Sequence, residues 1–436
     1  MPKFTGLSCL SNAAMLKKIT VDELRLGMYL HGLCGAWVDH PFWKSRFELR
    51  NAADLALLRE SSVRECWIDV SKGLDLQTVV AAPEPRASLP VTFATAPTAS
   101  ARVVTPDPQA AATLKEELGR AASLVNRSRA QMKSLFQAAR LGRSVDAETC
   151  LPLVADITTS VWRNPGALIS LARLKTHDDY SYMHSVAVCA LMVSLARQLG
   201  QDEVQAREAG LAGLLHDMGK AMMPLDVLNK PGKLSVAEFD LIKSHPLRGH
   251  ELLQGGTATP TMALDVCLHH HERPDGKGYP FGLSGDALTV SARMGSVCDV
   301  YDAITSNRPY KDGWDPAESI ARMTAWAKDG QFDMQVFAAF VKSLGVYPVG
   351  SLVRMRSGRL AVIAEQSATQ LLKPWVKVFY STRSQMPVPL ELLDTSDARC
   401  SDQISARESN EVWKFPHLEE LWAGRDALAS LTAGPR

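Results

Sequence analysis

The sequence predicts a multidomain protein whose large central domain is all-α, with a small α/β domain before it and a small β unit after it. The chain has 436 residues, more than one domain usually holds. A stretch rich in Pro, Ala, Ser and Thr at 81–110 has the composition of a linker. From about residue 146 to 344 apolar residues recur with the helical period, whereas residues 348–380 alternate as strands do.

The first domain is expected over residues 1–80. The apolar runs MYLHGLCGAW and ECWIDV are typical of strands, and the stretch NAADLALLRES between them has helical character. After the linker, a long pattern of polar and apolar residues predicts a connecting helix over 111–145.

The central domain is expected over residues 146–344. Ser235 and Glu238 form a capping-box pattern that begins one of its helices, and Pro246 is expected to end another. The segment 345–436 is expected to be a small β appendage, built around a Ser-Gly turn, with a less regular tail.

Composition excludes several classes of protein. With 46% hydrophobic residues the chain can bury a large core, so disorder is not expected. A formal net charge of +1 gives no general attraction to DNA, RNA or an anionic membrane. The eight cysteines are scattered, which is typical of reduced thiols in a cytoplasmic protein. The longest apolar run, at 186–196, is about half the length of a membrane span, so no membrane span is expected.

Histidines and carboxylates gather at separated places in the central domain. The segment HHHERPDGKGYPFG, from His269 to Gly282, puts three imidazoles before a turn marked by glycines and prolines. The other candidates, in chain order, are His184 in YMHSV, His216 and Asp217 in LLHDMGK, His245 in KSHPLRGH, Asp299 and Asp302 in VCDVYDAI, and Arg308 with Lys311 in NRPYK.

These residue types suit a metal centre. Mixed imidazole and carboxylate ligands favour Fe, Mn or Zn, whereas thiolates favour softer metals and all-oxygen shells favour Mg or Ca. A carboxylate can bridge two cations, which makes Asp217 the natural bridging ligand. Two ions about 3.5–4 Å apart can clamp the attacking and leaving oxygens of a phosphoryl displacement. Each feature alone has an ordinary explanation: a lone His245 at a helix end, a surface run of histidines, or a solvated helix face for the two aspartates.

Taken together and in this order, the motifs resemble the HD-GYP family, a subset of the HD phosphohydrolases. The resemblance covers about residues 146–343 and implies an all-α HD-type catalytic domain. The matching motifs are HS-x-x-V at 184–188, LLHDMGK at 214–220, NKPGKLS at 229–235, H-x-x-x-G at 245–249, HHERPDGKGYP at 270–280 and CDVYDAITSNRPYK at 298–311. The stretch ITVDELRLGMYL at 19–30 is more loosely similar to a small domain often found ahead of HD-GYP modules.

The resemblance implies a role for each matching residue. The ligands of two divalent ions per chain would be His184, His216, Asp217, His245, His270, His271 and Asp299. Iron or manganese would be favoured, with Zn, Ni or Co as alternatives. Lys220 would act with Asp217 in catalysis, either by countering negative charge or by protonating the leaving oxygen. Substrate would be held by Tyr279, Arg308 and Lys311, with Asp302 as a supporting carboxylate. Arg273 and Lys277 are candidates for further positive charge at the rim, and His269 is expected to be a bystander.

The resemblance implies hydrolysis of cyclic di-GMP to linear pGpG, with GMP as a further product left open, by a hydroxide held between the two metals. Two alternatives remain. The protein could be a catalytically weak cyclic di-GMP sensor or docking module, or it could hydrolyse another cyclic dinucleotide such as cyclic GMP-AMP. Diguanylate cyclases are candidate protein partners, and the sequence is compatible with a homodimer.

The number of metals depends on one further position. Some HD-GYP proteins hold a third metal through a glutamate one helical turn before the His of the HS-x-x-V motif. Here that position, four residues before His184, is Tyr180. A neutral phenol is a poorer ligand for a divalent ion than a carboxylate. We therefore predict a two-metal site in which Tyr180 is a wall residue.

Overall fold

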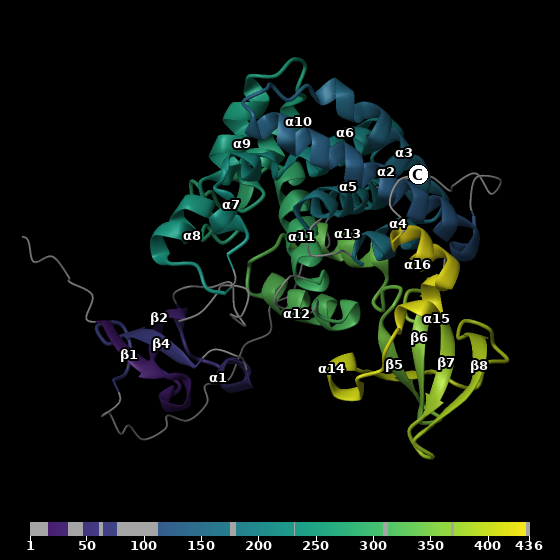
Figure 1. Ribbon diagram of the computed structural model, residues 1–436. Coiled ribbons are helices and arrows are strands. Elements are labelled where there is room, and N and C mark those ends of the chain that lie inside the picture. The colour runs from purple at the N-terminus through teal and green to yellow at the C-terminus, as the bar shows by residue number, and fades with distance from the viewer. Residues whose placement is uncertain are drawn as a thin grey trace, which may run out of the picture. The chain divides into compact units, whose positions relative to one another are not determined.

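The computed structural model of the chain describes most of its length (Figure 1). The described residues are 16–33, 47–60, 64–75, 112–174, 180–230, 232–307, 313–367 and 370–432. They belong to two compact units, residues 1–100 and residues 101–436.

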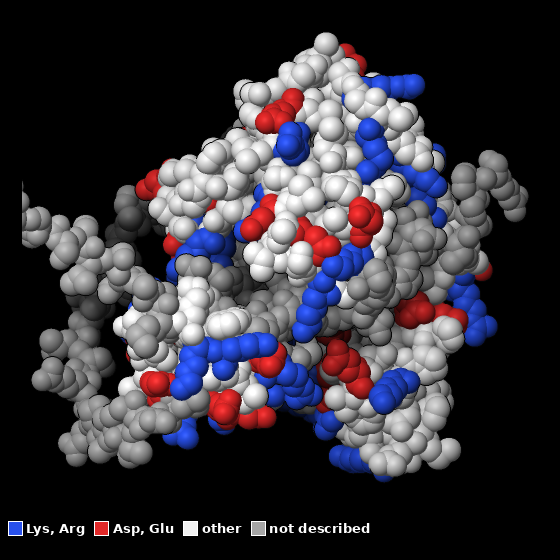
Figure 2. Space-filling model, turned by 60° about the vertical axis from the view of Figure 1, so that its left-hand side comes forward, with Lys and Arg blue, Asp and Glu red and all other residues white. Residues whose placement is uncertain are grey.

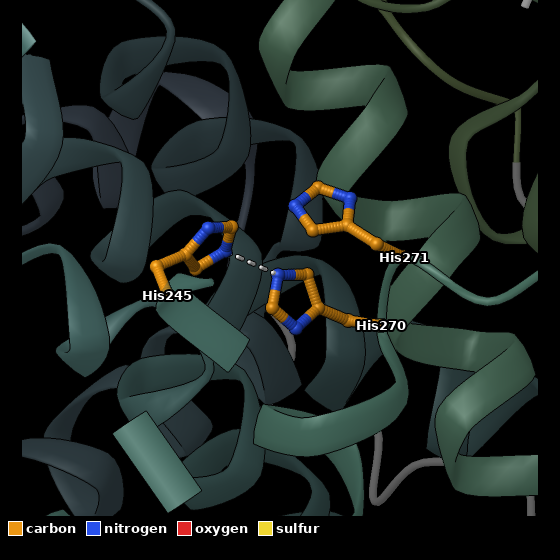
Figure 3. A group of neighbouring side chains, drawn as sticks. All are labelled: His245, His270 and His271. Atoms are coloured by element: carbon orange, nitrogen blue, oxygen red, sulfur yellow. Dashed lines mark hydrogen bonds between the residues drawn. The ribbon is translucent and has the colours of Figure 1, made fainter. Parts of the chain in front are cut away.

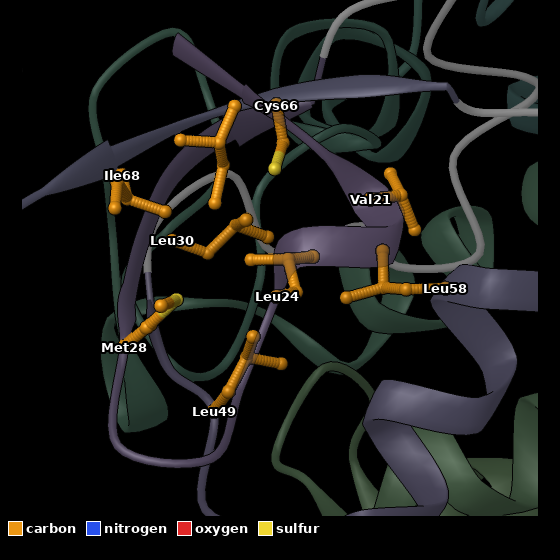
Figure 4. Packing of buried hydrophobic residues seen from close by; sticks show 9 residues of the cluster. Val21, Leu24, Met28, Leu30, Leu49, Leu58, Cys66 and Ile68 are labelled. Atoms are coloured by element: carbon orange, nitrogen blue, oxygen red, sulfur yellow. The ribbon is translucent and has the colours of Figure 1, made fainter. Parts of the chain in front are cut away.

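The first unit is a small antiparallel sheet with one helix. Its elements are β1 (Leu16–Thr20), the 3-10 helix η1 (Val21–Glu23), β2 (Tyr29–Leu33), β3 (Phe47–Glu48), α1 (Ala52–Glu60) and β4 (Glu65–Asp69). The strands lie in the order β1-β4-β2-β3. Leu58 of α1 joins Leu30 of β2 and Ile68 of β4 in one buried apolar cluster (Figure 4). The predicted α/β character of this unit is confirmed.

The second unit begins with a large set of packed helices. They are α2 (Leu114–Arg140), η3 (Ala147–Cys150), α3 (Leu151–Arg163), α4 (Pro165–Ala172), α5 (Tyr180–Gln198), α6 (Glu203–Leu215), η5 (Met218–Met222), α7 (Leu225–Leu228), α8 (Val236–Ile242), α9 (His245–Gln254), α10 (Thr261–His269), η6 (Gly285–Ala287), α11 (Val290–Thr305), α12 (Pro316–Lys328) and α13 (Met334–Leu344). Helix α5 is buried along nearly its whole described length, so it is the centre of the bundle. The all-α central domain is confirmed.

The long helix α2 is part of this bundle. It packs against α3, α4 and α5. Its N-terminus is closed by a capping box between Thr113 and Glu116. In its first turns the fully buried carboxylate of Glu117 accepts hydrogen bonds from the Arg163 guanidinium at 2.7 and 2.8 Å and from the Ser160 hydroxyl at 2.8 Å. A buried carboxylate needs such partners, so this network fixes α2 on α3.

The end of the chain forms a five-stranded antiparallel sheet in the order β8-β7-β6-β5-β9 and three short helices. The elements are β5 (Leu352–Met355), β6 (Arg359–Glu365), β7 (Trp375–Ser381), β8 (Met386–Asp394), β9 (Ile404–Arg407), α14 (Asn410–Trp413), α15 (Glu419–Ala423) and α16 (Arg425–Thr432). The predicted Ser-Gly turn connects β5 to β6. This β unit is held to the helices, because Glu365 of β6 accepts from the backbone N–H of Leu114 at 3.1 Å and α16 packs on α2.

One expected helix end is wrong. Pro246 lies in the first turn of α9, which begins at His245, instead of closing the helix before it. Proline is tolerated there because the first N–H groups of a helix have no partner within it. Among the described residues, no helix combines the length and the apolar character that crossing a membrane requires. The six cysteines in the described part of the chain are free.

Candidate metal centre

Five helix ends and helix faces bring the predicted ligands together. His184 is the fifth residue of α5, and His216 and Asp217 follow directly on the last residue of α6. His245 is the first residue of α9. His270 and His271 follow the end of α10, and Asp299 lies within α11. His271 is partly buried and the other six are buried.

Two glycines allow this convergence. A Cβ atom on Gly219 would lie 1.8 Å from the backbone oxygen of His245, and one on Gly249 would lie 2.7 Å from Sγ of Cys267. Side chains at these positions would therefore push η5 away from α9, and α9 away from α10. The close approach keeps Asp217 within reach of His245: their Oδ1 and Nε2 atoms are 3.2 Å apart.

The first group of side chains is formed by His184, His216 and Asp299, whose ligand atoms all lie within 4.8 Å of one another. Nε2 of His184 lies 2.9 Å from Oδ1 of Asp299, and Nε2 of His216 lies 3.8 Å from the same oxygen. An imidazole pair and a carboxylate at this spacing can hold one divalent cation.

The second group is formed by His245, His270 and His271 (Figure 3). Their rings face one another across a small space, with Nε2 of His245 and Nε2 of His270 3.3 Å apart. The rings of His270 and His271 have centroids 4.1 Å apart. The triple histidine of the sequence thus contributes two imidazoles to this group. His269 instead contacts Asp265, with Nδ1 2.8 Å from Oδ1, as expected of a bystander.

Asp217 lies between the two groups and presents one oxygen to each. Its Oδ2 atom is 3.4 Å from Nε2 of His184 and 3.5 Å from Nε2 of His216. Its Oδ1 atom is 3.2 Å from Nε2 of His245 and 3.8 Å from Nε2 of His270. This is the arrangement that a bridging carboxylate requires.

The proton positions on three of the imidazoles follow from their neighbours. Nδ1 of His216 lies 2.7 Å from the Gly213 carbonyl and Nδ1 of His245 lies 2.7 Å from the Ile242 carbonyl. Nδ1 of His270 lies 3.0 Å from two carbonyls of α10. A carbonyl only accepts, so each Nδ1 carries the hydrogen and each neutral ring presents an Nε2 lone pair to the cavity.

The lone pairs that converge here fit a cation. Nε2 of His216 and Oδ1 of Asp217 are buried and have no hydrogen-bond partner among the described residues. Oδ1 of Asp217 and the Nε2 atoms of His245 and His270 are mutual acceptors at 3.2 to 3.8 Å, and their lone pairs repel one another unless a positive charge lies between them. The donor set of imidazoles and carboxylates therefore fits bound divalent metal ions.

Burial and charge set the protonation of the cluster. Burial lowers the pKa of His270 well below its ordinary value and lowers the pKa of His271 to about 3, so both rings are neutral. For Asp217, burial opposes ionisation, but the positive charge of Lys220 outweighs it and holds the pKa of Asp217 well below its usual range. Burial likewise disfavours the charged form of Asp299, but its hydrogen bond with His184 outweighs burial and lowers its pKa well below the usual range.

Lys220 and Tyr279 lie beside the cluster. Nζ of Lys220 is 2.5 Å from Oδ2 of Asp217. The Tyr279 ring stacks on the His271 ring with centroids 4.6 Å apart. Burial, together with the charges of Asp299 and Asp217, raises the pKa of Tyr279 well above its ordinary value, so the phenol keeps its proton and can donate it.

The turn that carries Tyr279 is anchored by Glu272, a residue that the sequence analysis did not single out. Its carboxylate is buried and accepts hydrogen bonds from the backbone N–H groups of Phe281, Gly282 and Leu283 at 2.6, 3.0 and 3.0 Å. A Cβ on Gly278 would lie 2.4 Å from Cα of Glu272, so the turn folds back directly on this residue. A glutamate next to two ligand histidines gave no signal of its own in the sequence.

Asp302 is held on His184. Its Oδ2 atom lies 2.6 Å from Nδ1 of His184, and its Oδ1 atom accepts from the Ser306 hydroxyl at 3.1 Å. Only 2% of the residue is exposed, so it supports His184 from behind and does not face a substrate directly. Burial alone would lower the pKa of His184, but its hydrogen bonds to Asp299 and Asp302 outweigh burial and raise it.

The cations expected at the rim are engaged locally. Arg273 is buried, and its guanidinium contacts the Asp275 carboxylate at 3.1 and 2.6 Å. Nζ of Lys277 lies 3.7 Å from the same carboxylate. Arg273 therefore does not provide free positive charge at the rim. Arg308 and Lys311 lie outside the described residues, and so does the side chain of Tyr180, whose backbone begins α5.

Comparisons with known proteins agree with this fold. The family model described as HD domain matches residues 164–336, and a domain of unknown function, DUF3391, matches residues 16–150. A cyclic di-GMP phosphodiesterase of Pseudomonas aeruginosa is 53% identical over 411 residues, which cover 94% of this chain and 96% of that protein.

Other relatives match a smaller part of the chain. The cyclic di-GMP phosphodiesterase response regulator RpfG of Xanthomonas campestris pv. campestris is 45% identical over 30% of this chain and 35% of its own length. The 3'3'-cGAMP-specific phosphodiesterase 1 of Vibrio cholerae is 34% identical over 39% of each chain.

A helical bundle that gathers buried imidazoles and aspartates around a bridging carboxylate defines a metal-dependent hydrolase of the HD domain class. The chain belongs to the HD-GYP family of phosphodiesterases within that class.

Proposed function

We propose that the protein is a metal-dependent phosphodiesterase that hydrolyses cyclic di-GMP to linear pGpG, with GMP as a further product where the linear dinucleotide is bound again. The observation that carries the proposal is the pair of histidine groups joined by Asp217, on a chain 53% identical over 94% of its length to a protein named as a cyclic di-GMP phosphodiesterase.

The donor atoms define two places for a cation. His184, His216 and Asp299 would hold one ion, and His245, His270 and His271 would hold the other, with Asp217 shared between them. Iron or manganese suits this ligand set best, with Zn, Ni or Co as alternatives. When bound, such ions lower the pKa of water, which makes a hydroxide nucleophile available near neutral pH.

The protein's own side chains supply the rest of the chemistry. Lys220 is the cation nearest to Asp217, and a metal ion bound there would compete with it for Oδ2. A displaced ammonium is well placed to counter charge on the reacting phosphate or to protonate the leaving ribose oxygen. The phenol of Tyr279 remains a donor beside His271 and can bind a phosphate or ribose oxygen. Arg308 and Lys311 would bind phosphate as a fork and as a point charge, respectively.

Two other functions remain to be separated from this one. A relative that is 34% identical over 39% of this chain is named as specific for 3'3'-cGAMP, so hydrolysis of that mixed dinucleotide is the second candidate activity. A sensor that binds cyclic di-GMP without turning it over is the third candidate. The intact set of donor atoms favours turnover over sensing.

The deciding experiment is turnover by protein purified without oxygen and loaded with iron or manganese. Cyclic di-GMP, 3'3'-cGAMP and cyclic di-AMP are offered separately, and pGpG and GMP are resolved by chromatography. We expect the highest kcat/KM with cyclic di-GMP. Faster hydrolysis of 3'3'-cGAMP would show that this dinucleotide is the preferred substrate. Tight binding of cyclic di-GMP without product would identify a sensor.

The shared ligand provides a second test. Asp217→Ala should remove both metals and all turnover, because it removes a ligand from each place at once. Arg308→Ala should keep the metals and weaken substrate binding alone. Metal analysis and kinetics on the two variants distinguish these effects. An Asp217→Ala protein that keeps its metals and its activity would contradict the assignment.

A further inference from the structure

The C-terminal end of α2 contacts the segment that carries Lys220. Arg140, the last residue of α2, donates from its guanidinium to the backbone oxygen of Met223 at 2.9 Å and to that of Lys220 at 3.5 Å. These two carbonyls lie at the end of η5, the short helix that begins directly after Asp217. One planar guanidinium therefore spans the backbone that positions the catalytic lysine.

Helix η5 packs closely on α9 at Gly219, and Arg140 adds a contact to its C-terminal end from α2. Helix η5 is a short 3-10 helix of five residues, and the Met223 N–H donates to the Lys220 oxygen at its end at 3.2 Å. A cationic donor at the C-terminal end of a helix can bond its last carbonyls and interacts favourably with the helix dipole. Arg140 supplies that donor from a helix distant in the sequence.

A second contact of α2 reaches the same site from another side. Phe136, which is 5% exposed, packs edge-to-face on Tyr182 with ring centroids 5.3 Å apart. Tyr182 lies on α5, two residues before His184. The last turn of α2 thus touches the helix of a predicted ligand as well as the lysine segment.

We propose that Arg140 is a positioning residue for the phosphodiesterase reaction, holding η5 so that Lys220 meets the reacting phosphate; this inference rests on the proposed function. Arg140 lies outside the region matched by the HD domain model and inside the region matched by the domain of unknown function. Helix α2, which carries Arg140, packs within the catalytic unit. The part of the chain matched by the domain of unknown function therefore contributes a residue to the site.

Kinetics on Arg140→Ala, Lys220→Ala and the double variant test the proposal. Lys220 acts on the transition state, so Arg140→Ala should lower kcat about 10-fold and leave KM within about 2-fold. In the Lys220→Ala background the same change should alter kcat less than about 2-fold, because Arg140 acts through the lysine. An unchanged kcat in the single variant, or an equal loss in both backgrounds, would overturn the proposal.

Two further variants exclude a merely structural effect. Arg140→Lys keeps the charge but loses the fork, so its kcat should lie between those of wild type and Arg140→Ala. If Arg140→Ala does not fold, the cycle is run with Arg140→Lys instead. Lys133→Ala removes an exposed cation from the same helix and should match wild type. A loss of kcat in Lys133→Ala equal to that in Arg140→Ala would show that any cation on α2 has this effect.

Amide hydrogen exchange gives a readout that does not depend on turnover. Amides of residues 217–223 should exchange faster in metal-free Arg140→Ala than in wild type, and at the wild-type rate in Lys133→Ala. Unchanged exchange in Arg140→Ala would contradict the proposed contact. If wild-type protein hydrolyses bis(p-nitrophenyl) phosphate but not cyclic di-GMP, the proposed function is wrong. The kinetics of Arg140→Ala, Lys220→Ala and the double variant, measured with that ester, still test the role of Arg140.

Discussion

At the scale of single residues, four of the histidines in the site already have one ring nitrogen in contact with a protein group. Three of the histidines donate Nδ1–H to nearby helix carbonyls and a fourth, His184, contacts Asp302, so each ring can turn only one nitrogen to the metals. Such outer contacts fix the tautomer and orientation of a ligand before any metal arrives. The groups that orient the ligand histidines are therefore as necessary for the geometry of the site as the ligands themselves.

Glu272 allows a direct test of this view. Glu272→Gln keeps the volume of the side chain but leaves one acceptor oxygen for three backbone N–H groups and places an amide donor among them. Hydrogen bonds to charged groups contribute about 1.5–3 kcal/mol. We expect the turn that carries Tyr279 to loosen, KM to rise about 10-fold and the metals to stay bound. Kinetics and metal analysis measure both effects.

The matched control for this prediction is Glu251→Gln, which neutralises an exposed glutamate on α9. Its KM and thermal stability should equal those of wild type. A Glu272→Gln protein with wild-type KM would show that the turn is held by other contacts.

The number of metals is tested at Tyr180. Metal analysis of substrate-free protein, purified without oxygen, should give close to two ions per chain, because the position four residues before His184 lacks a carboxylate. Tyr180→Glu should raise the value toward three, and Tyr180→Phe should leave it unchanged. A value near three in wild type would contradict the prediction.

At the scale of elements, the sequence predicted the site through residue type and the order of motifs, and it failed where packing decides. Capping residues predicted the start of α8, since the Ser235 hydroxyl accepts from the Glu238 N–H at 3.2 Å. Pro246 was misassigned because proline is compatible both with a position beyond the end of a helix and with its first turn. Only the packing of α9 on η5 distinguishes the two.

Long-range contacts were also beyond prediction. Gly219 and Gly249 lie within motifs of the sequence, but nothing in those motifs indicates that each glycine lets two elements approach closely. Arg140 lies 80 residues before Lys220 and gave no motif. Periodicity and capping are local signals, so they indicate where a helix runs but not which helix its end will touch.

The contact between α12 and the β unit gives a prediction of pH dependence. Burial raises the pKa of Asp315 to about 6, although its carboxylate accepts from the backbone N–H of Ala317, Glu318 and Leu352. The native carboxyl therefore keeps its proton to higher pH than the unfolded chain does. Between about pH 4 and pH 6 the native state binds more protons, so this group's contribution to the free energy of unfolding falls as pH rises.

Asp315→Asn removes that titration. From pH 4 to pH 7 the free energy of unfolding of wild type should fall by about 2 kcal/mol relative to that of Asp315→Asn. The side chain is partly buried, so solvent screens part of the effect. Urea unfolding at several pH values measures it. Parallel pH profiles for the two proteins would contradict the raised pKa of Asp315.

At the scale of the whole molecule, positive and negative charges nearly cancel, so any positive field must be confined to a small part of the surface. With 48 Lys and Arg against 47 Asp and Glu, the chain has no general field to attract a dinucleotide. Blue and red side chains are interspersed over the described surface seen in Figure 2. Recognition of an anionic substrate must therefore come from the metals and from the few cations close to them.

The division into two units leads to a prediction about truncation. We propose that residues 1–80 form a regulatory or docking domain, that 81–110 form a linker, and that 111–145, 146–344 and 345–436 fold together. The contacts of α2 with α3 and of Glu365 with Leu114 support this division. A protein starting at Ala101 keeps the capping box of α2, its buried Glu117 and all the predicted ligands. It should fold, bind the same metals and hydrolyse substrate with kcat within about 2-fold of the full chain.

A protein starting at Ala121 is the comparison, because it lacks in addition residues 101–120, which include the capping box and the first turns of α2. It lacks Glu117 and leaves the Arg163 guanidinium without the buried carboxylate that holds it. Losing one partner of such a pair costs about 3–5 kcal/mol, and losing the helix cap costs about 1 kcal/mol more. This shorter protein should be much less stable to urea, and α2 should no longer hold Arg140 against η5. If the protein starting at Ala101 is itself insoluble or metal-free, residues 1–100 belong to the catalytic fold and the proposed division is wrong.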